Sequence, residues 1–227
     1  MSPPPLETVE IEPRTAAADA AVVLMHGLGA DGHDFESLVP ELRLPGSPSV
    51  RFVFPHAPVR PVTINAGFRM RAWYDIAALD RRAAEDDHGI RRSAEAIGAL
   101  VRRERERGIP ADRIVLAGFS QGGAMALFTA LRWPERLGGV VGLSCYLPLA
   151  ATLADEAHPA NAALPVFLAH GSFDPVVPLP LGEGSREILR ARGYDVGWHT
   201  YPMPHSVCAA EIEDLRGWLL AAIPARA

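Results

Sequence analysis

The stretch RIVLAGFSQGG, residues 113–123, joins an apolar run to a serine that has one glycine two residues before it and another two residues after it. If 113–119 form a buried strand and 121–132 a helix, Ser120 stands in the turn between them. Side chains at the two glycine positions would clash with the neighbouring backbone, and glycine removes that clash. Such a turn exposes the serine hydroxyl at the positive end of the helix, beside the backbone N–H of Gln121. The stretch predicts a nucleophilic serine, and an ordinary strand-to-helix loop is the alternative.

The rest of the chain alternates short apolar runs with amphipathic segments, which is typical of a mostly parallel sheet with helices on both faces. The expected strands are 20–25, 50–54, 113–119, 138–144, 165–171 and 195–201, with 9–12 as an antiparallel edge strand. The expected helices are 34–43, 88–107, 121–132, 182–192 and 207–222, and the segments 55–87 and 145–164 are expected to be irregular loops beside the site. The fold class is therefore α/β, with about six to seven strands in the sheet. We expect a single domain over 1–227, with residues 1–7 flexible.

The composition is that of a soluble globular protein, and it excludes several partners. Hydrophobic residues make up 48% of the 227 positions, and the formal net charge of −5 gives no basic surface for nucleic acid or an anionic membrane. All 22 basic residues are arginine, which excludes chemistry that needs a lysine amine. No stretch is apolar over the ~20 residues that a membrane span needs, and the first residues do not read as a secretory signal. We expect a cytoplasmic location, no stable membrane insertion and no nucleic-acid partner.

The two cysteines, Cys145 and Cys208, are too few for a disulfide scaffold and lack the spacing of a metal site. They are expected to be free thiols in a reducing compartment. No HExxH pattern or Cys/His cluster indicates zinc. The sequence therefore predicts neither a metal nor another cofactor.

A serine hydroxyl is a weak nucleophile, so it needs a base within hydrogen-bond reach and a group that orients the base. His205 is the best placed of the eight histidines, because it lies between the last expected strand and the last helix. Asp174 follows the strand at 165–171 and gives the chain order Ser120, Asp174, His205. All three lie at the carboxyl ends of strands, where ligands bind in such sheets. Asp75 is the alternative acid, although it precedes the serine.

The glycine-rich stretch HGLGADG, residues 26–32, follows the first central strand. Such a loop supplies a backbone N–H to a negatively charged intermediate, and a plain turn is the alternative. We expect the N–H groups of Leu28 and Gln121 to form the oxyanion hole. His26 and His170 directly follow strands and are rivals of His205 for the role of base, with hydrogen-bonded residues that brace their loops as the alternative.

Taken together, these motifs resemble the bacterial carboxylesterase branch of the phospholipase/carboxylesterase family, which also contains the acyl-protein thioesterases. The matching stretches are VVLMHGLGADGHDFESLVPEL at 22–42, WYDI at 73–76, GFSQGGAMAL at 118–127, LSCYLP at 143–148, DPVVP at 174–178 and YPMPHSVCAAEIEDLRGWL at 201–219. The resemblance implies an α/β-hydrolase without a cap domain that cleaves carboxylic esters and, in some members, thioesters of acylated proteins.

The same resemblance places the triad on Ser120, Asp174 and His205, and the oxyanion donors on Leu28 and Gln121. It also implies a possible homodimer. The chain departs from the family at Pro204, where relatives commonly carry glycine. Because proline restricts its own φ and the conformation of the residue before it, we expect a slightly different path for the histidine loop.

Apolar residues on the loops beside the expected site are the candidates for a substrate-binding acyl pocket. They are Phe68, Met70, Trp73, Ile76, Leu147 and Val176. Arg69 and Arg71 are candidates for recognising an acidic leaving group, with solvated surface charges as the alternative.

The sequence thus predicts a serine carboxylesterase that hydrolyses short- to medium-chain esters of small molecules through an acyl-enzyme on Ser120. A thioesterase acting on acylated proteins or a lysophospholipase would use the same triad. An acyltransferase or perhydrolase would differ only in the nucleophile that reaches the acyl-enzyme. A non-catalytic ligand-binding protein on the same fold is the remaining alternative, because a fold does not fix a function.

Overall fold

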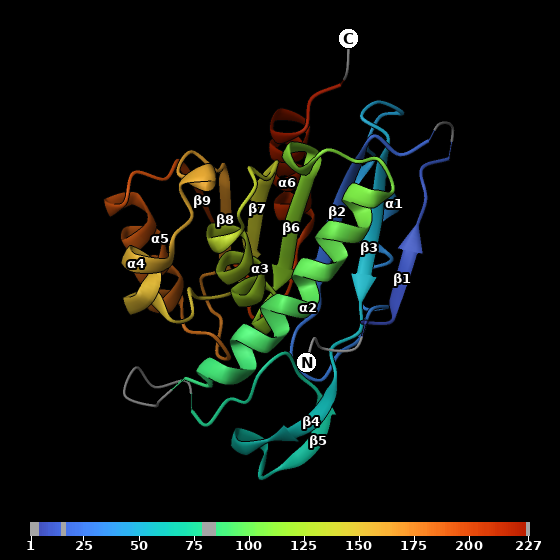
Figure 1. Ribbon diagram of the computed structural model, residues 1–227. Coiled ribbons are helices and arrows are strands. Elements are labelled where there is room, and N and C mark those ends of the chain that lie inside the picture. Colours follow the sequence, from blue (N-terminus) through green and yellow to red (C-terminus); the bar gives the residue numbers. More distant parts are fainter. Residues whose placement is uncertain (1–4, 15–16, 79–84, 226–227) are drawn as a thin grey trace.

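The computed structural model describes residues 5–14, 17–78 and 85–225, and a seven-stranded sheet runs through its centre (Figure 1). The strand order is β1-β3-β2-β6-β7-β8-β9, and every neighbouring pair is parallel except β1 with β3. The strands are β1 (Thr8–Ile11), β2 (Ala20–Met25), β3 (Val50–Pro55), β6 (Ile114–Phe119), β7 (Gly139–Leu143), β8 (Val166–Gly171) and β9 (Val196–Tyr201). The predicted α/β class and the antiparallel edge strand are confirmed.

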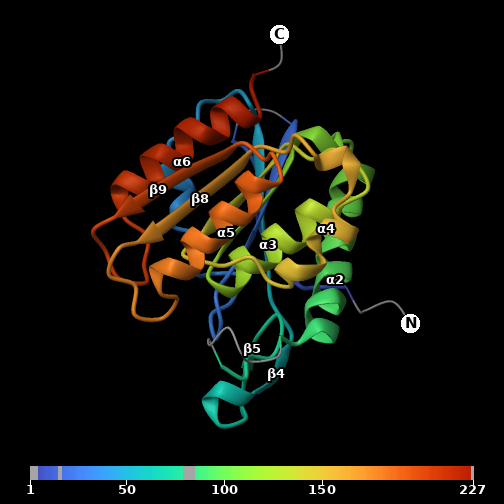
Figure 2. The ribbon, with the colours of Figure 1, turned by 90° about the vertical axis from the view of Figure 1, so that its left-hand side faces the viewer.

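Helices cover both faces of the sheet, and alternate residues of each central strand pack on opposite sides (Figure 2). In β2, Ala21, Val23 and Met25 join the core under one set of helices, while Ala20, Val22 and Leu24 join the other core. The helices on the first side are α2 (Asp87–Glu106), α3 (Gln121–Arg132), α4 (Leu153–Glu156) and α5 (Leu179–Ala191), and those on the second are α1 (Leu38–Leu42) and α6 (Ala209–Ala222). This double cover explains why the strands read as almost continuous apolar runs.

Two predicted helices have different boundaries from those expected. The segment 34–43 is helical only over Leu38–Leu42, and 34–37 form turns, because Pro40 lacks the N–H that would extend the helix backwards. The helix expected at 182–192 begins earlier, at Leu179, since Pro180 is tolerated in the first turn.

The segment 55–87 is not wholly irregular, contrary to the prediction. It contains a hairpin of β4 (Val59–Val62) and β5 (Phe68–Arg71), which pair antiparallel and project from the carboxyl edge of the main sheet (Figure 1). Short 3-10 turns complete the chain: η1 (Thr63–Asn65), η2 (Ala111–Arg113), η3 (Ala150–Thr152) and η4 (Pro159–Asn161). The described residues contain no cap domain over the sheet edge, and none of their helices is both long and apolar enough to cross a membrane.

Of the segment 1–7 that we predicted to be flexible, residues 1–4 lie outside the described residues. The carbonyl of Glu7 accepts a hydrogen bond of 2.8 Å from the backbone N–H of His56, so the chain is tied to β3 at that point. Farther along the same edge, the buried carboxylate of Glu104 on α2 pairs with Arg51, Arg103 and Arg107 and joins the helix to β3.

Candidate active site

Ser120 stands in a sharp turn between β6 and α3, as the sequence predicted. Its φ of 55° and ψ of −121° are rarely adopted by a residue with a side chain, and such strain is typical of functional positions. The Ser120 N–H donates to the carbonyl of Leu143 over 2.8 Å, and its own carbonyl accepts from Ala124 N–H over 3.1 Å. The turn is therefore fixed to the neighbouring strand on one side and to the helix on the other.

The two glycines around the serine are required by close backbone contacts. A Cβ at Gly118 would lie 2.2 Å from the carbonyl carbon of Gly122, and a Cβ at Gly122 would lie 2.2 Å from the carbonyl oxygen of Met25. Both distances are far below van der Waals contact, and the opposing atoms are backbone. The clash inferred from the sequence is thus present at both positions.

His205 and Asp174 form a close pair on the loops that follow β9 and β8. The Nδ1 of His205 donates to Oδ2 of Asp174 over 2.6 Å. The other carboxylate oxygen of Asp174 accepts from the backbone N–H groups of Val176 and Val177, at 2.8 and 2.9 Å. The carboxylate is therefore held in place and holds the imidazole as the tautomer whose Nε2 is free to accept a proton.

The imidazole of His205 also contacts the serine turn directly. Its ring centroid lies 4.5 Å from that of Phe119, the residue immediately before Ser120. Asp75, the alternative acid, accepts hydrogen bonds from the N–H and hydroxyl of Thr63 at 2.7 and 2.6 Å. Asp75 therefore binds the turn that joins β4 to β5, and Asp174 is the carboxylate that pairs with His205.

Pro204 forms part of a compact turn beside this pair. The carbonyl of Pro204 accepts from Ser206 N–H over 2.9 Å, and a Cβ at Gly171 would lie 2.4 Å from the same carbonyl oxygen. The proline therefore packs against the end of β8, and the loop still delivers His205 to Asp174.

The HGLG loop after β2 lies against Ser120 on the other side. A Cβ at Gly27 would lie 3.4 Å from Cβ of Ser120, so the loop and the serine are in contact. Gly29 has a φ of 80° and its N–H donates to the carbonyl of Arg71 over 2.9 Å. Leu28 lies between these two anchors, and no carbonyl of the described residues accepts a hydrogen bond from its N–H.

A network of buried hydrogen bonds holds this loop and the start of α3 together. The side chain of Gln121 accepts from the Trp73 N–H and donates to the Tyr74 carbonyl, each over 2.8 Å. The indole N–H of Trp73 donates to the carbonyl of His26 over 2.9 Å. The sequence motif assigned a role to the backbone N–H of Gln121 and missed its side chain. The sequence feature that indicates a side-chain role is the position of this polar residue at the start of the apolar stretch QGGAMALF.

His26 and His170 brace loops, the alternative given for their positions in the sequence. His26 donates from Nδ1 to the Gly27 carbonyl over 2.6 Å and accepts from Ala57 N–H at Nε2 over 3.1 Å. Burial lowers the pKa of His26 to about 4, so this imidazole is neutral at physiological pH. His170 donates from Nε2 to the carbonyl of Val177 over 2.8 Å and so supports the Asp174 loop.

The six acyl-pocket candidates fall into three groups. Phe68 and Val176 are exposed, at 70% and 47%, while Met70 and Ile76 are half-buried. Trp73 and Leu147 lie in the core, so in this structure they are not open to substrate. Core packing accounts for both residues, and Trp73 in addition uses its indole N–H to brace the HGLG loop.

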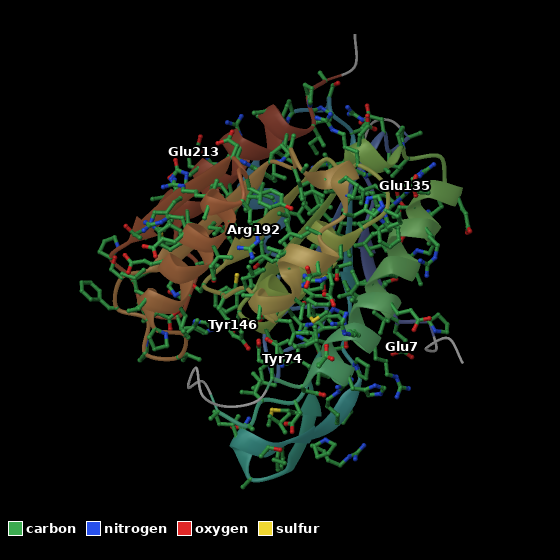
Figure 3. All side chains as sticks on the ribbon, turned by 60° about the vertical axis from the view of Figure 1, so that its left-hand side comes forward. Glu7, Tyr74, Glu135, Tyr146, Arg192 and Glu213 are labelled. Atoms are coloured by element: carbon green, nitrogen blue, oxygen red, sulfur yellow. The ribbon has the colours of Figure 1, made fainter. Side chains whose placement is uncertain are left out.

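The other predicted residues either make structural contacts or are exposed to solvent. The guanidinium of Arg71 donates to the Ala57 carbonyl over 2.9 Å, and Arg69 is exposed on the hairpin. The hydroxyls of Tyr74 and Tyr146 lie 2.9 Å apart and link the WYDI and LSCYLP loops (Figure 3). Both cysteines are free, and the described residues include no group of three or more His, Cys, Asp and Glu side chains arranged to hold a metal ion.

A seven-stranded α/β sheet that carries a serine on a strained turn and a His–Asp pair beside it defines a serine hydrolase of the α/β-hydrolase fold. Residues 6–223 match the family model described as Phospholipase/Carboxylesterase, and the chain belongs to that family.

Curated relatives and solved structures agree with this assignment. Acyl-protein thioesterase 1 of Neurospora crassa is 41% identical, with 97% of this chain and 92% of the relative covered, and acyl-protein thioesterase 1 of Gibberella zeae is also 41% identical, with 93% and 94% covered. The crystal structure of Zea mays acyl-protein thioesterase 2 is 32% identical with a TM-score of 0.85, and covers 96% of this chain and 99% of its own. The chain is thus similar to these enzymes over nearly its whole length.

Proposed function

We propose that the protein hydrolyses short- to medium-chain carboxylic esters through an acyl-enzyme on Ser120. The observation that carries this proposal is the combination of the strained Ser120 turn with the 2.6 Å bond between His205 and Asp174. A binding protein would need neither the strain nor an oriented imidazole. Strain of this kind costs of order 1–3 kcal/mol and persists only where the surroundings enforce it.

In the first step, His205 takes the hydroxyl proton of Ser120 at Nε2 while the serine oxygen attacks the acyl carbon. Asp174 holds the imidazole and stabilises the imidazolium that forms. The N–H groups of Leu28 and Gln121 donate to the negatively charged oxygen of the tetrahedral intermediate. His205 then gives the proton to the leaving alcohol, and the acyl-enzyme remains.

In the second step, a water molecule replaces the alcohol. His205 accepts a proton from the water, whose oxygen attacks the acyl carbon of the ester on Ser120. The same two N–H groups stabilise the second tetrahedral intermediate. Its collapse releases the carboxylic acid and returns the proton from His205 to Ser120.

A thioesterase acting on acylated proteins is the second candidate, and the relatives favour it. The curated relatives at 41% identity are named acyl-protein thioesterases. The described residues leave the carboxyl edge of the sheet without a cap, and apolar side chains of Phe68, Phe173 and Val176 are exposed near it. An uncapped site of this kind is accessible to a lipidated peptide as well as to a small ester.

The test compares purified wild type with Ser120→Ala on p-nitrophenyl esters from acetate to palmitate. We expect wild-type turnover to peak at short or medium chains and kcat to fall about 10³-fold or more in the variant, because the nucleophile is lost. Circular dichroism and thermal unfolding check that the variant is folded. Ester turnover retained by a contaminant-free Ser120→Ala protein would remove Ser120 from the nucleophile role.

A parallel assay separates the two candidates. An S-octanoyl cysteine peptide and p-nitrophenyl octanoate carry the same acyl chain, so their kcat/KM ratio reports the leaving group and its protein context. A higher kcat/KM for the ester supports the carboxylesterase. A higher kcat/KM for the thioester peptide supports the protein thioesterase instead.

A further inference from the structure

A cleft of about 680 Å³ lies between the hairpin β4–β5 and the first turns of α2. Its walls come from the base of the hairpin β4–β5, the first turns of α2 and residues 5–7. None of Ser120, Asp174 and His205 lines it. The volume falls within the range of small-molecule sites in proteins.

Three arginines line this cleft, and their donors are poorly matched by acceptors. Nε of Arg60 is buried and has no hydrogen-bond partner, and its nearest ion-pair contact is a long one of 3.9 Å from Nη1 to Asp86. Arg71 donates from Nη1 to the Ala57 carbonyl, which is neutral. Arg92 is exposed and forms no ion pair with the described residues. Burial and the charge of Arg92 both oppose the charge on Arg60, and its pKa is lowered.

Of the three carboxylates that line the cleft, Asp75 and Asp86 are already occupied. Asp86 caps α2, accepting from Gly89 N–H and Asp75 N–H, each over 2.9 Å. Asp75 accepts two hydrogen bonds from Thr63. Glu7 is exposed at the rim (Figure 3). The cleft therefore has an excess of cationic donors over free acceptors, which suits an anion.

The same cleft has an apolar wall opposite the arginines. Pro58, Val59 and Pro61 all line it. Arginine in such a setting binds a carboxylate or phosphate with paired hydrogen bonds, whereas the apolar wall favours a hydrocarbon body. A ligand that satisfies both sides is an amphiphile with one anionic head.

We propose that this cleft is a second binding site, for an organic anion whose carboxylate or phosphate head lies against Arg60, Arg71 and Arg92 and whose apolar body lies against Pro58 and Val59. The site does not depend on the hydrolytic activity, since it shares no residue with the triad. Trp73 connects the cleft to the HGLG loop, because its indole N–H donates to the His26 carbonyl.

Isothermal titration calorimetry on the Ser120→Ala protein tests the site separately from turnover. The probes are octyl phosphate, octanoate, inorganic phosphate and octyltrimethylammonium. We expect the two octyl anions to bind, with the Kd raised about tenfold in Arg60→Gln and in Arg92→Gln, because each change removes a charged donor. Arg69→Gln is the matched control on the same hairpin, because Arg69 is exposed and does not line the cleft.

The arms of this experiment distinguish the possible ligands. Weak binding of inorganic phosphate and no binding of octyltrimethylammonium support an amphiphilic anion. An unchanged Kd in both Arg60→Gln and Arg92→Gln would overturn the proposal, and so would equal binding of the octyl cation. Because Arg92 is exposed, its variant is expected to fold even if Arg60→Gln does not.

Discussion

At the scale of single residues, the site depends on two positions where a side chain cannot be accommodated. Ser120 adopts a left-handed φ because Gly118 and Gly122 let β6, α3 and β2 approach each other within backbone contact. The serine hydroxyl is thereby presented at the sheet edge without help from a flexible loop. Because the backbone segments are in contact, even one methyl group added at either glycine would disturb the turn.

Gly122→Ala tests this closeness. The added Cβ would lie 2.2 Å from the Met25 carbonyl oxygen and 2.6 Å from that of His26. Because only backbone movement can relieve this contact, we expect a loss of about 1–3 kcal/mol or more in the free energy of unfolding, measured in urea, together with loss of esterase activity.

Gly217→Ala is the control for that experiment. Gly217 lies on α6, and an added Cβ there meets nothing within 4 Å. We expect this change to stabilise the protein by about 0.5–1 kcal/mol, since alanine favours a helix interior. Wild-type stability and activity in Gly122→Ala would contradict the steric explanation of the turn.

At the scale of elements, the sequence predicts best where burial is complete. β2, β6, β7 and β8 are covered on both faces, so their apolar runs identified them to within a residue or two at each end. β4 and β5 escaped prediction because each has only four residues and is largely open to solvent, and Pro61 argues against a strand. They form an isolated two-stranded ribbon, for which sequence patterns are weak.

The candidate site was also predicted only in part. The order of Ser120, Asp174 and His205 along the chain, with their strand-end positions, was enough to predict the His–Asp pair. The link from Gln121 to Trp73 and Tyr74 spans 47 or 48 residues of sequence. No local pattern encodes such a contact, because it depends on how the WYDI loop packs over α3.

Gln121→Met tests the link between these elements. Methionine keeps the volume and the backbone N–H, but it leaves the Trp73 N–H and the Tyr74 carbonyl unpaired in a buried site. We expect a loss of about 1–3 kcal/mol for each unpaired group and a lower kcat, because the HGLG loop is braced through Trp73. Urea unfolding and p-nitrophenyl butyrate turnover measure the two effects.

Thr129→Val provides the comparison on the same helix. The Thr129 hydroxyl is buried and has no hydrogen-bond partner, so replacing it with a methyl group removes no bond. We expect unchanged or slightly higher stability and normal turnover. If Gln121→Met behaved like Thr129→Val, the bridging amide would not be what holds the loop.

At the scale of the whole molecule, one buried carboxyl on α6 affects stability across a range of pH. Glu211 lies in the first turn of α6, fully buried, and neither carboxylate oxygen has a hydrogen-bond partner. Burial raises the pKa of Glu211 to about 8 from a usual value of 4.5. The folded protein therefore keeps this proton under conditions where the unfolded chain has lost it.

The sign of the pH dependence follows from that difference. Below pH 4.5 both states hold the proton, so Glu211 contributes no slope; between 4.5 and about 8 the unfolded state binds fewer protons, and stability falls as pH rises. Each pKa unit corresponds to about 1.4 kcal/mol, so the contribution by pH 8 is on the order of several kcal/mol.

Glu211→Gln removes this pH-dependent loss of stability, and we expect the variant to gain stability over wild type progressively from pH 5 to pH 8 in urea unfolding. Glu213→Gln, at an exposed position on the same helix, is the matched control for the loss of one carboxylate. A constant difference between Glu211→Gln and wild type over this range would mean that Glu211 is ionised in the folded protein as it is in the unfolded chain.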